Sequence, residues 1–353
     1  MKKYLIIMAL AAGVLALAAC DKRATLPQEP SQKATLTVSI DKPATKAVYT
    51  DQRNEDPSNP MKIEWEADDL ISVLIFNDSG LAMDGESHAH YLFAATSGGG
   101  TAVFESETAP RALNEGEYYL IVYPALTAVI SDEEAGIYQL NNRYCFYLED
   151  NDGISFVFDL RYGNHGSPPE LAEKNDTHYL NDVDLMTAIV IGDFPSGDGA
   201  PHVHLSHEIG LLAVRIADIS VLAEHDPEVV ITGADITMLP DGSTCNQLTY
   251  DFLERQFMSY DYEVSELHLA YEDPIDVPTD GLVFYFPVVE MDLTGGDSFY
   301  FWVASTYIDD EDTEQPWPAH YMVEVPTGAA FHVSPGVMSN LVFGPNTTWD
   351  TGI

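Results

Sequence analysis

Basic residues are scarce in this chain. Its 353 residues include 15 Lys and Arg against 57 Asp and Glu, which gives a formal net charge of −42. So acidic a surface repels nucleic-acid phosphates and anionic membranes, and we expect binding to neither through electrostatics. Enzymes that transfer phosphoryl groups use cations to offset phosphate charge, so the scarcity also argues against that class.

Familiar enzyme motifs are missing as well. The sequence contains no G-x-S-x-G, no G-x-x-x-x-G-K-[ST] and no G-x-G-x-x-G. Carboxylates are so numerous that a pair resembling the acid and base of a glycosidase arises by chance. Only this abundance favours a hydrolase. We therefore predict a protein that is not an enzyme and that holds no cofactor.

His202 and His204 are the best candidates for a metal site. On a strand, residues two positions apart share a face, as two zinc-binding imidazoles must. A third ligand from His207 requires a bend after Leu205, and Leu211 stands where a zincin motif has its second His. Surface histidines beside a polar linker explain the same residues, so we predict no metal.

Cysteine is rare, with three residues in the chain. Cys145 and Cys245 belong to no C-x-x-C pattern, and the sequence leaves open whether they pair. The third, Cys20, follows Leu-Ala-Ala at the end of an apolar stretch that begins behind Lys2 and Lys3. This arrangement resembles a bacterial lipobox. We predict a lipoprotein signal peptide over residues 1–19 and lipidation of Cys20, so that a lipid anchors the mature chain.

The remaining chain is patterned as strands. Residues 20–34 are polar and are expected to form a tether. Leu36, Val38 and Ile40 then alternate with hydroxyl residues, as in a half-buried strand. Many short apolar runs follow, and together they predict β-sandwiches. The runs lie at 70–76, 91–95, 101–105, 117–123, 144–148, 154–160, 184–191, 202–217, 229–237, 247–251, 263–271, 281–289, 298–307, 321–325 and 339–343.

Turn residues divide this pattern. Gly98 to Gly100 and the acidic segment 149–153 are expected to be hairpin turns. Residues 193–201 are rich in Gly, Pro and Asp. We therefore predict one β-sandwich over 35–200 and a second over 201–353.

The few basic residues are unevenly placed. Lys2 and Lys3 belong to the signal peptide, which leaves 15 − 2 = 13 in the mature chain, and seven of these lie between Lys22 and Lys62. None follows Arg255. Residues 41–62 are expected to form a loop, where proteases cut. A protease that cuts after basic residues would act mainly there, although compositional drift in an acidic protein explains the same distribution.

The chain contains a series of motifs, each of which is weakly specific alone but more specific in combination with the order in which they occur. They are the lipobox at Cys20, the strand at 35–40, Ala44–Ala47, Trp65–Val73, Tyr118–Pro124, Asp184–Ala188, Val203–Ile216, and Val333–Gly336 before the last strand. In this order they resemble the fimbrillin family, the lipoprotein-derived pilins and fimbrillin-like surface proteins of Gram-negative anaerobes. The resemblance covers most of the chain.

The resemblance implies a fold and a route of assembly. Such proteins are two tandem transthyretin-like β-sandwiches after a lipoprotein signal peptide. A protease removes an N-terminal strand, and a strand donated by another subunit fills the groove. The displaceable strand here would carry Leu36, Val38 and Ile40. Processing would follow Lys46, with Arg53 as the second site.

The resemblance also implies partners. These are other fimbrial subunits, the outer membrane through the lipid anchor, and a host protein or glycan receptor; nucleic acid is not expected. The chain would lie at the cell outer membrane or in a surface fimbrium. Leu341 and Phe343 are the candidate donor-strand residues. Lys46 stands where stalk subunits have Arg, and the chain ends soon after Gly336, so an anchor, tip, accessory or non-polymerising role stays open.

A surface lipoprotein that binds glycans is the alternative function. Trp317 lies between Pro316 and Pro318, and it or Trp349 would stack on sugar rings beside carboxylates. Burial in a core is the competing interpretation of both residues. We expect Trp65 to belong to the core.

Overall fold

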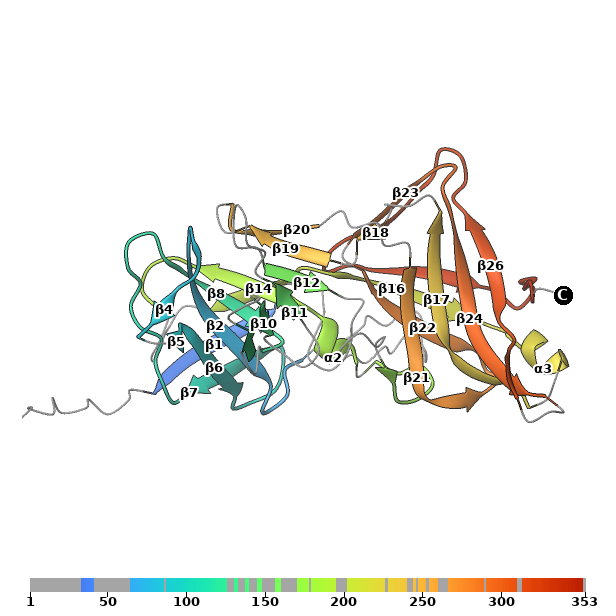
Figure 1. Ribbon diagram of the computed structural model, residues 1–353, viewed down its shortest axis with the longest axis horizontal. Coiled ribbons are helices and arrows are strands. Elements are labelled where there is room, and N and C mark those ends of the chain that lie inside the picture. The colour runs from blue at the N-terminus through green and yellow to red at the C-terminus, as the bar shows by residue number, and fades with distance from the viewer. Residues whose placement is uncertain are drawn as a thin grey trace, which may run out of the picture.

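The protein is built from β-sheets joined by loops (Figure 1). The computed structural model describes residues 33–40, 64–85, 87–125, 130–132, 137–139, 145–147, 156–159, 170–177, 179–194, 202–225, 228–239, 244–245, 247–251, 254–259, 266–288, 290–309 and 313–351. The helices there are two short ones, α2 (Leu180–Val183) and α3 (Val221–His225). The predicted all-β class is confirmed. None of the helices described is long and apolar enough to cross a bilayer.

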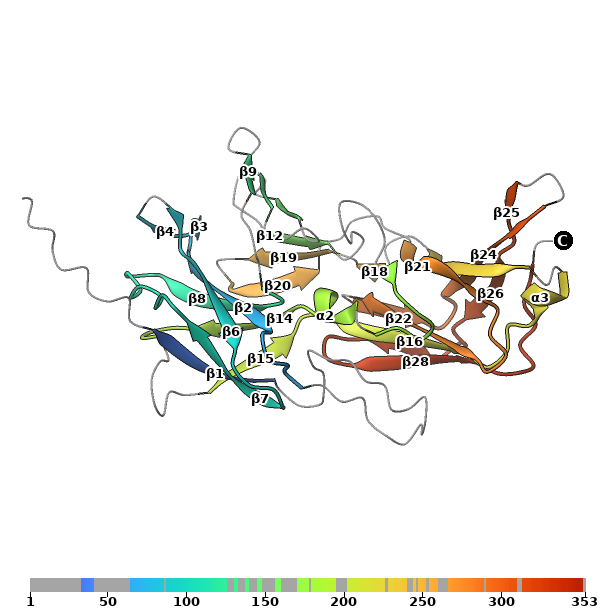
Figure 2. The same ribbon diagram turned by 90° about the horizontal axis from the view of Figure 1, so that it is seen from below.

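The first sheet closes into a barrel. Its strands are β1 (Ala34–Ile40), β2 (Leu70–Asn77), β3 (Gly80–Leu81), β6 (His90–Ala95), β7 (Thr101–Ser106), β8 (Tyr118–Tyr123), β14 (Met186–Val190) and β15 (Val203–His207). The order runs β2-β6-β7-β1-β15-β14-β8, and β8 pairs again with β2. Strand β1 is antiparallel to β7 and parallel to β15, and Figure 2 shows it beside both. It lies across the barrel from the β2–β8 pairing.

Alternation along these strands fills the barrel. Side chains that point inward form one buried cluster, which includes Leu36, Val38, Ile71, Val73, Ile75, Phe93, Phe104, Tyr119, Ile121 and Leu205. On β2 and β8 the outward side chains are buried too, because both strands are apolar on both faces. Phe76 and Tyr118 are among these, and they belong to a second cluster that extends through the later sheets.

Two further sheets face each other across the second core. One contains β13 (Glu170–Leu171), β21 (Glu266–Asp276), β17 (Val230–Leu239), β24 (Ser298–Ile308), β25 (Glu314–Pro316) and β26 (Ala319–Glu324); the other contains β22 (Leu282–Val288), β16 (Gly210–Ile216) and β28 (Met338–Phe343). Phe301 on β24 meets Phe284, Phe286 and Phe343 from the opposite sheet at ring-centroid distances of 5.3–6.3 Å.

Smaller sheets complete the described fold. They are β18 (Thr244–Cys245) with β23 (Glu290–Thr294) and β27 (Ala330–Val333); β12 (Phe156–Asp159) with β19 (Gln247–Asp251) and β20 (Gln256–Ser259); β9 (Ile130–Asp132) with β10 (Ile137–Gln139) and β11 (Cys145–Tyr147); and β4 (Met83–Asp84) with β5 (Ser87–His88).

Sheet pairing crosses the boundary expected at residue 200. Strand β15 lies beyond that residue, yet it pairs with β1 and β14 in the barrel. Strand β13 lies before it, yet it pairs with β21 in the second half. Hydrogen bonds between distant strands decide membership of a sheet, and a polar linker marks only where the chain can bend. The division into two domains stays a prediction.

Candidate functional site: strand β1 and its slot

Strand β1 is held by its inward side chains. Leu36 and Val38 have no exposed surface, and Ala34 is 2% exposed. Ile40, at the end of the strand, is half-buried and packs against the same cluster. Thr35 and Thr37 point the other way and remain half-exposed. The expected alternation holds from Ala34 to Val38, whereas Ser39, which was expected on the same face as Thr35 and Thr37, is buried at 8% exposure. Full burial of each Leu or Val contributes about 1.5–3 kcal/mol.

Both edges of β1 are paired. Leu36 lies opposite Phe104 of β7, and Val38 lies between Ala102 of β7 and Val203 of β15. We call the space between β7 and β15 that β1 fills the β1 slot. An empty slot would leave two unpaired strand edges and an opening into the apolar interior. Unpaired edges of this kind readily accept another strand.

Trp65 lies against the wall of the β1 slot. Its indole packs edge-on to the rings of Phe104, at 5.1 Å, and Tyr123, at 5.2 Å. Its backbone exchanges two hydrogen bonds with Gly99 in the β6–β7 turn. A Cβ at Gly98 would lie 2.6 Å from the carbonyl oxygen of Trp65, so this turn requires glycine to approach so closely. Trp65 is 1% exposed, in agreement with the expected core position.

Polar contacts also fix strands of the barrel. The hydroxyl of Ser39, on β1, lies 2.7 Å from Nδ1 of His204 on β15. On β2 and β6, the hydroxyl of Ser72 lies 2.8 Å from Nε2 of His90. Burial lowers the pKa of His90 to about 4. The imidazole of His90 is therefore neutral at pH 7.

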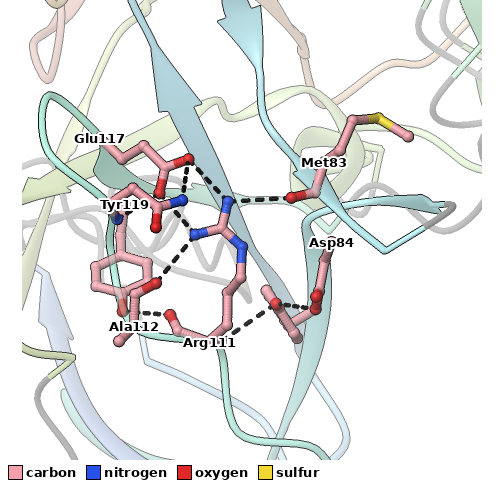
Figure 3. Close-up of polar contacts among 8 residues, drawn as sticks. Met83, Asp84, Arg111, Ala112, Glu117 and Tyr119 are labelled. Atoms are coloured by element: carbon pink, nitrogen blue, oxygen red, sulfur yellow. Dashed lines mark hydrogen bonds and ion pairs between the residues drawn. The ribbon is translucent and has the colours of Figure 1, made fainter.

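A clasp of charged groups holds the segment between β7 and β8 (Figure 3). The two terminal guanidinium nitrogens of Arg111, Nη1 and Nη2, donate to the carboxylate of Glu117, over 2.6 and 2.8 Å. Asn114 donates its backbone N–H to the same carboxylate. Hydrogen bonds from Arg111, more than any other contact, lower the pKa of Glu117 to about 2. We call these three residues the Arg111 clasp.

Neighbouring contacts tie the Arg111 clasp to the barrel. The hydroxyl of Tyr119 donates to the carbonyl oxygen of Arg111 over 2.7 Å, and a guanidinium nitrogen donates to the carbonyl oxygen of Met83. Tyr91 donates its hydroxyl to Asp84 over 2.6 Å and accepts the backbone N–H of Arg111. Burial, with the hydrogen bond to Asp84, raises the pKa of Tyr91 to about 12. Sequence patterns did not reveal this clasp, because its three residues match no motif and the residues that tie it to the barrel, Met83 and Tyr91, lie 28 and 20 positions from Arg111.

Most described basic residues are held within the fold. The contacts join Arg111 to Glu117, Lys174 to Asp280, Arg215 to Asn340, and Arg255 to the ring of Tyr118. Lys33, just before β1, is exposed. A protease that cuts after Lys or Arg must bind that side chain in a deep pocket. A guanidinium or ammonium group held by these contacts cannot easily enter the pocket, so the peptide bond after it is a poor target.

The predicted modification sites lie outside the described residues. These are the lipidation site Cys20 and the processing sites Lys46 and Arg53. The candidate donor-strand residues are described, and they lie in β28, which pairs parallel to β16 at a sheet edge. Phe343 is 4% exposed within the second core, and Leu341 is half-buried against it.

The histidines considered for a metal site lie in different environments. His202 and His204 are exposed, with ring centroids 6.4 Å apart. The side chain of His207 is 5% exposed, and its Nδ1 lies 2.7 Å from a carboxylate oxygen of Asp184. No cluster of three or more His, Cys, Asp or Glu that could hold a metal ion occurs among the residues described.

The tryptophans proposed as sugar platforms pack against the core. Trp349 is 8% exposed and donates its indole N–H to the carbonyl oxygen of Asp218 over 3.1 Å. Trp317 is half-buried and lies edge-on to Tyr307. The sequence patterns missed Trp302, whose ring stacks on His320 at 4.3 Å on the outer side of β24 and β26.

Comparisons with solved structures find similar chains. Crystal structures of candidate cell adhesion proteins match from Bacteroides uniformis (15% identity, 80% of this chain and 88% of that chain, TM-score 0.40) and Bacteroides ovatus (12%, 90% and 95%, TM-score 0.44). A fimbrial protein from Bacteroides vulgatus matches at 10% identity over 89% of this chain and 96% of that chain, with a TM-score of 0.35. No family model and no curated protein matches the sequence.

Proposed function

We propose that this chain is a fimbrial subunit or accessory pilin for cell adhesion. It is exported as a lipoprotein through Cys20, anchored in the outer membrane, and assembled with other fimbrial subunits by donor-strand exchange after N-terminal proteolysis. The observation that carries the proposal is the position of β1. This N-terminal strand completes the barrel, yet it is joined to the strands that follow only through residues 41–62, where the sequence predicts a loop.

A cut in that loop would separate β1 from the barrel covalently. Lys46 and Arg53 lie in the sequence between β1 and β2, where such a cut has this effect. The strand would then be held by its backbone ladders, by the apolar contacts of Ala34, Leu36, Val38 and Ile40, and by the contact of Ser39 with His204. A donated strand with the same alternation restores both ladders and the apolar contacts. Exchange should therefore change the stability of the subunit little.

Donor residues at the other end of the chain complete the proposal. Strand β28 is the last described strand and lies at an edge of its sheet, with β16 on its paired side. Leu341 and Phe343 alternate along it, as the residues of a donated strand must. Within the proposed fimbrium they leave their own core and occupy the next subunit.

Limited trypsin digestion of the lipid-free chain, residues 21–353, tests the proposal. We expect one early cut after Lys46 or Arg53, a resistant body, and oligomers that survive detergent but not heat. Intact mass measures the cut and native sizing measures the oligomers. A Lys46→Gln/Arg53→Gln/Lys62→Gln variant is the control, which should keep β1 covalently attached and stay monomeric. Early cuts at Arg111 or Arg215 would contradict it. A trimmed body that stays monomeric with its partner subunits would exclude strand exchange.

A glycan-binding lipoprotein is the second candidate function. The observation in its favour is the aromatic group on the outer face of β24 and β26, where Tyr300 lies 6.0 Å from Trp302, between ring centroids, and Trp302 stacks on His320. Aromatic rings with polar neighbours bind sugar rings. A glycan array should show hits for the wild type that Trp302→Ala loses; an array without hits would dismiss this function.

A further inference from the structure

The indole N–H of Trp65 has no hydrogen-bond acceptor among the described residues. Its nitrogen is fully buried, and the whole residue is 1% exposed. A buried Trp N–H usually finds a partner, because leaving it without one forfeits the hydrogen bond that it makes with water in the unfolded chain. The barrel therefore contains a buried N–H donor whose hydrogen bond is not made by any described residue.

The surroundings of Trp65 keep this donor inside. Two hydrogen bonds with Gly99 fix its backbone, and edge-on contacts with Phe104 and Tyr123 fix its ring. Phe104 lies opposite Leu36 of β1 in the antiparallel register. Trp65 and β1 thus share one buried cluster, and Trp65 belongs to the part of the chain that remains after a cut in the loop.

The inward face of β1 offers no acceptor to this donor. Ala34, Leu36 and Val38 are its buried inward residues, and none has a polar side-chain atom. The backbone carbonyls of β1 lie in the plane of the sheet and serve the ladders with β7 and β15. Because β7 and β15 stay in place during an exchange, the incoming strand can supply an acceptor to Trp65 Nε1 only through its inward side chains.

We infer that the strand which replaces β1 carries a hydroxyl or amide side chain on its inward face and accepts a hydrogen bond from Trp65 Nε1. This inference rests on the strand exchange proposed above. Both occupants of the slot form the same backbone ladders, so the inward side chains decide between them. One added net hydrogen bond corresponds to roughly a tenfold preference. The resident strand is then the weaker occupant, and exchange is favourable.

The first test uses the uncut chain, so it does not depend on exchange. Val38→Thr and Leu36→Asn nearly preserve side-chain shape and add an acceptor, and each is made with Trp65 and with Trp65→Phe. Urea unfolding measures the equilibrium constant of each protein. We expect at least one of the two substitutions to destabilise the Trp65 chain less than the Trp65→Phe chain. The difference should be about tenfold in the equilibrium constant of unfolding. Val303→Thr, in the other core, is the control that should show no such difference. Equal tolerance in both backgrounds would overturn the inference.

A spectroscopic measurement covers the case in which Trp65→Phe does not fold. The indole ¹⁵N–¹H resonance of Trp65 is compared between the wild type and the Val38→Thr and Leu36→Asn chains. Hydrogen bonding should move the proton downfield and slow its exchange with solvent in at least one of the two variants. An unchanged resonance in both variants would contradict the inference.

Peptide competition then connects the inference with exchange. The trypsin-nicked protein, with β1 still bound, is mixed with excess peptide of the β1 sequence or of the same sequence with Val38→Thr or Leu36→Asn. Native mass spectrometry counts the β1 released. We expect one polar peptide to compete about tenfold better than the resident sequence. If no peptide displaces β1, strand exchange itself is contradicted. If all three peptides compete equally, only the proposed role of Trp65 is contradicted.

Discussion

At the scale of single residues, Glu117 is a carboxylate held by several hydrogen bonds. It accepts two hydrogen bonds from Arg111 and one from the backbone of Asn114, and its side chain is 7% exposed. Hydrogen bonds to charged groups contribute more than neutral ones do. Because its pKa is lowered to about 2, ionised Glu117 stabilises the fold above the ordinary carboxyl range, and this contribution is lost as the pH falls toward 2.

Glu117→Gln should lower the free energy of unfolding at pH 7 by about 2 kcal/mol. The difference from the wild type should shrink as the pH falls from about 4.5 to about 2, since Glu117 is protonated at the end of that range. Urea unfolding at several pH values measures it. Glu115→Gln, at an exposed position two residues away, removes the same charge and should change little. An equal loss in both variants would mean that the Arg111 clasp contributes nothing specific.

His90 gives a second pH dependence. Its pKa falls from 6.5 in the unfolded chain to about 4 in the fold because of burial. Neutral His90 therefore stabilises the fold above pH 6.5, and this stability is lost as the pH falls toward 4. We expect His90→Gln to reduce the loss of stability over this range by on the order of 2 kcal/mol. The exposed His202→Gln is the control for urea unfolding, and identical pH profiles would refute the prediction.

At the scale of elements, β1 is packed through buried side chains, yet one cut in the chain between β1 and β2 would end its covalent connection to the barrel. Its alternation of apolar and hydroxyl residues predicted the strand and its two faces correctly. The pattern did not predict that β1 would lie between β7 and β15, nor that β15 would run parallel to it. Pairing partners are chosen by the closure of the whole sheet, and no local pattern encodes them.

Leu36→Ala should lower the free energy of unfolding by about 2–5 kcal/mol, because it leaves a cavity beside Phe104. The same change should speed loss of β1 from nicked protein, as native mass spectrometry records. Thr37→Ala alters the half-exposed face of the same strand and should cost less than about 1 kcal/mol. Similar costs at both positions would show that β1 is not held by its inward face.

Several elements differ from the sequence expectation. One strand was predicted over 202–217, but the chain turns at Glu208 and Ile209, so that β15 and β16 enter different sheets. A Cβ at Gly210 would lie 2.3 Å from the carbonyl oxygen of Ser334, a tertiary contact that the apolar pattern does not show. The runs at 144–148 and 154–160 were expected to pair as a hairpin. Strands β11 and β12 do lie side by side, with β10 paired to β11 and β19 paired to β12, while the turn 149–153 lies outside the described residues, so the hairpin stays a prediction.

At the scale of the whole molecule, one hydrophobic core connects the barrel with the later sheets. Tyr250, from the β19–β20 hairpin, packs on Phe76 of the barrel at 5.6 Å between ring centroids. Arg255, in the turn of that hairpin, lies 4.7 Å over the ring of Tyr118. These contacts cover the β2–β8 pairing, across the barrel from β1. They would support that side of the barrel when β1 leaves.

Tyr250→Ala should therefore uncouple the two parts. We expect the wild type to unfold in one calorimetric transition, and the variant to lose about 3–5 kcal/mol and to show two. Trp302→Ala, on an outer face, should retain a single transition. Two transitions in the wild type would show that the shared core does not couple the halves.

The sequence alone determined the all-β class, the approximate positions of the longer strands, and the inward residues of β1, because these depend on local alternation and composition. It also supplied the scarcity of basic residues outside the N-terminal segment. Only the tertiary structure decided that the first sheet closes into a barrel, that β15 joins it, and that the buried N–H of Trp65 finds no acceptor among the described residues. Each of these depends on contacts between residues far apart in the chain, where a strand fits one neighbour out of many and the pattern of a single strand cannot name it.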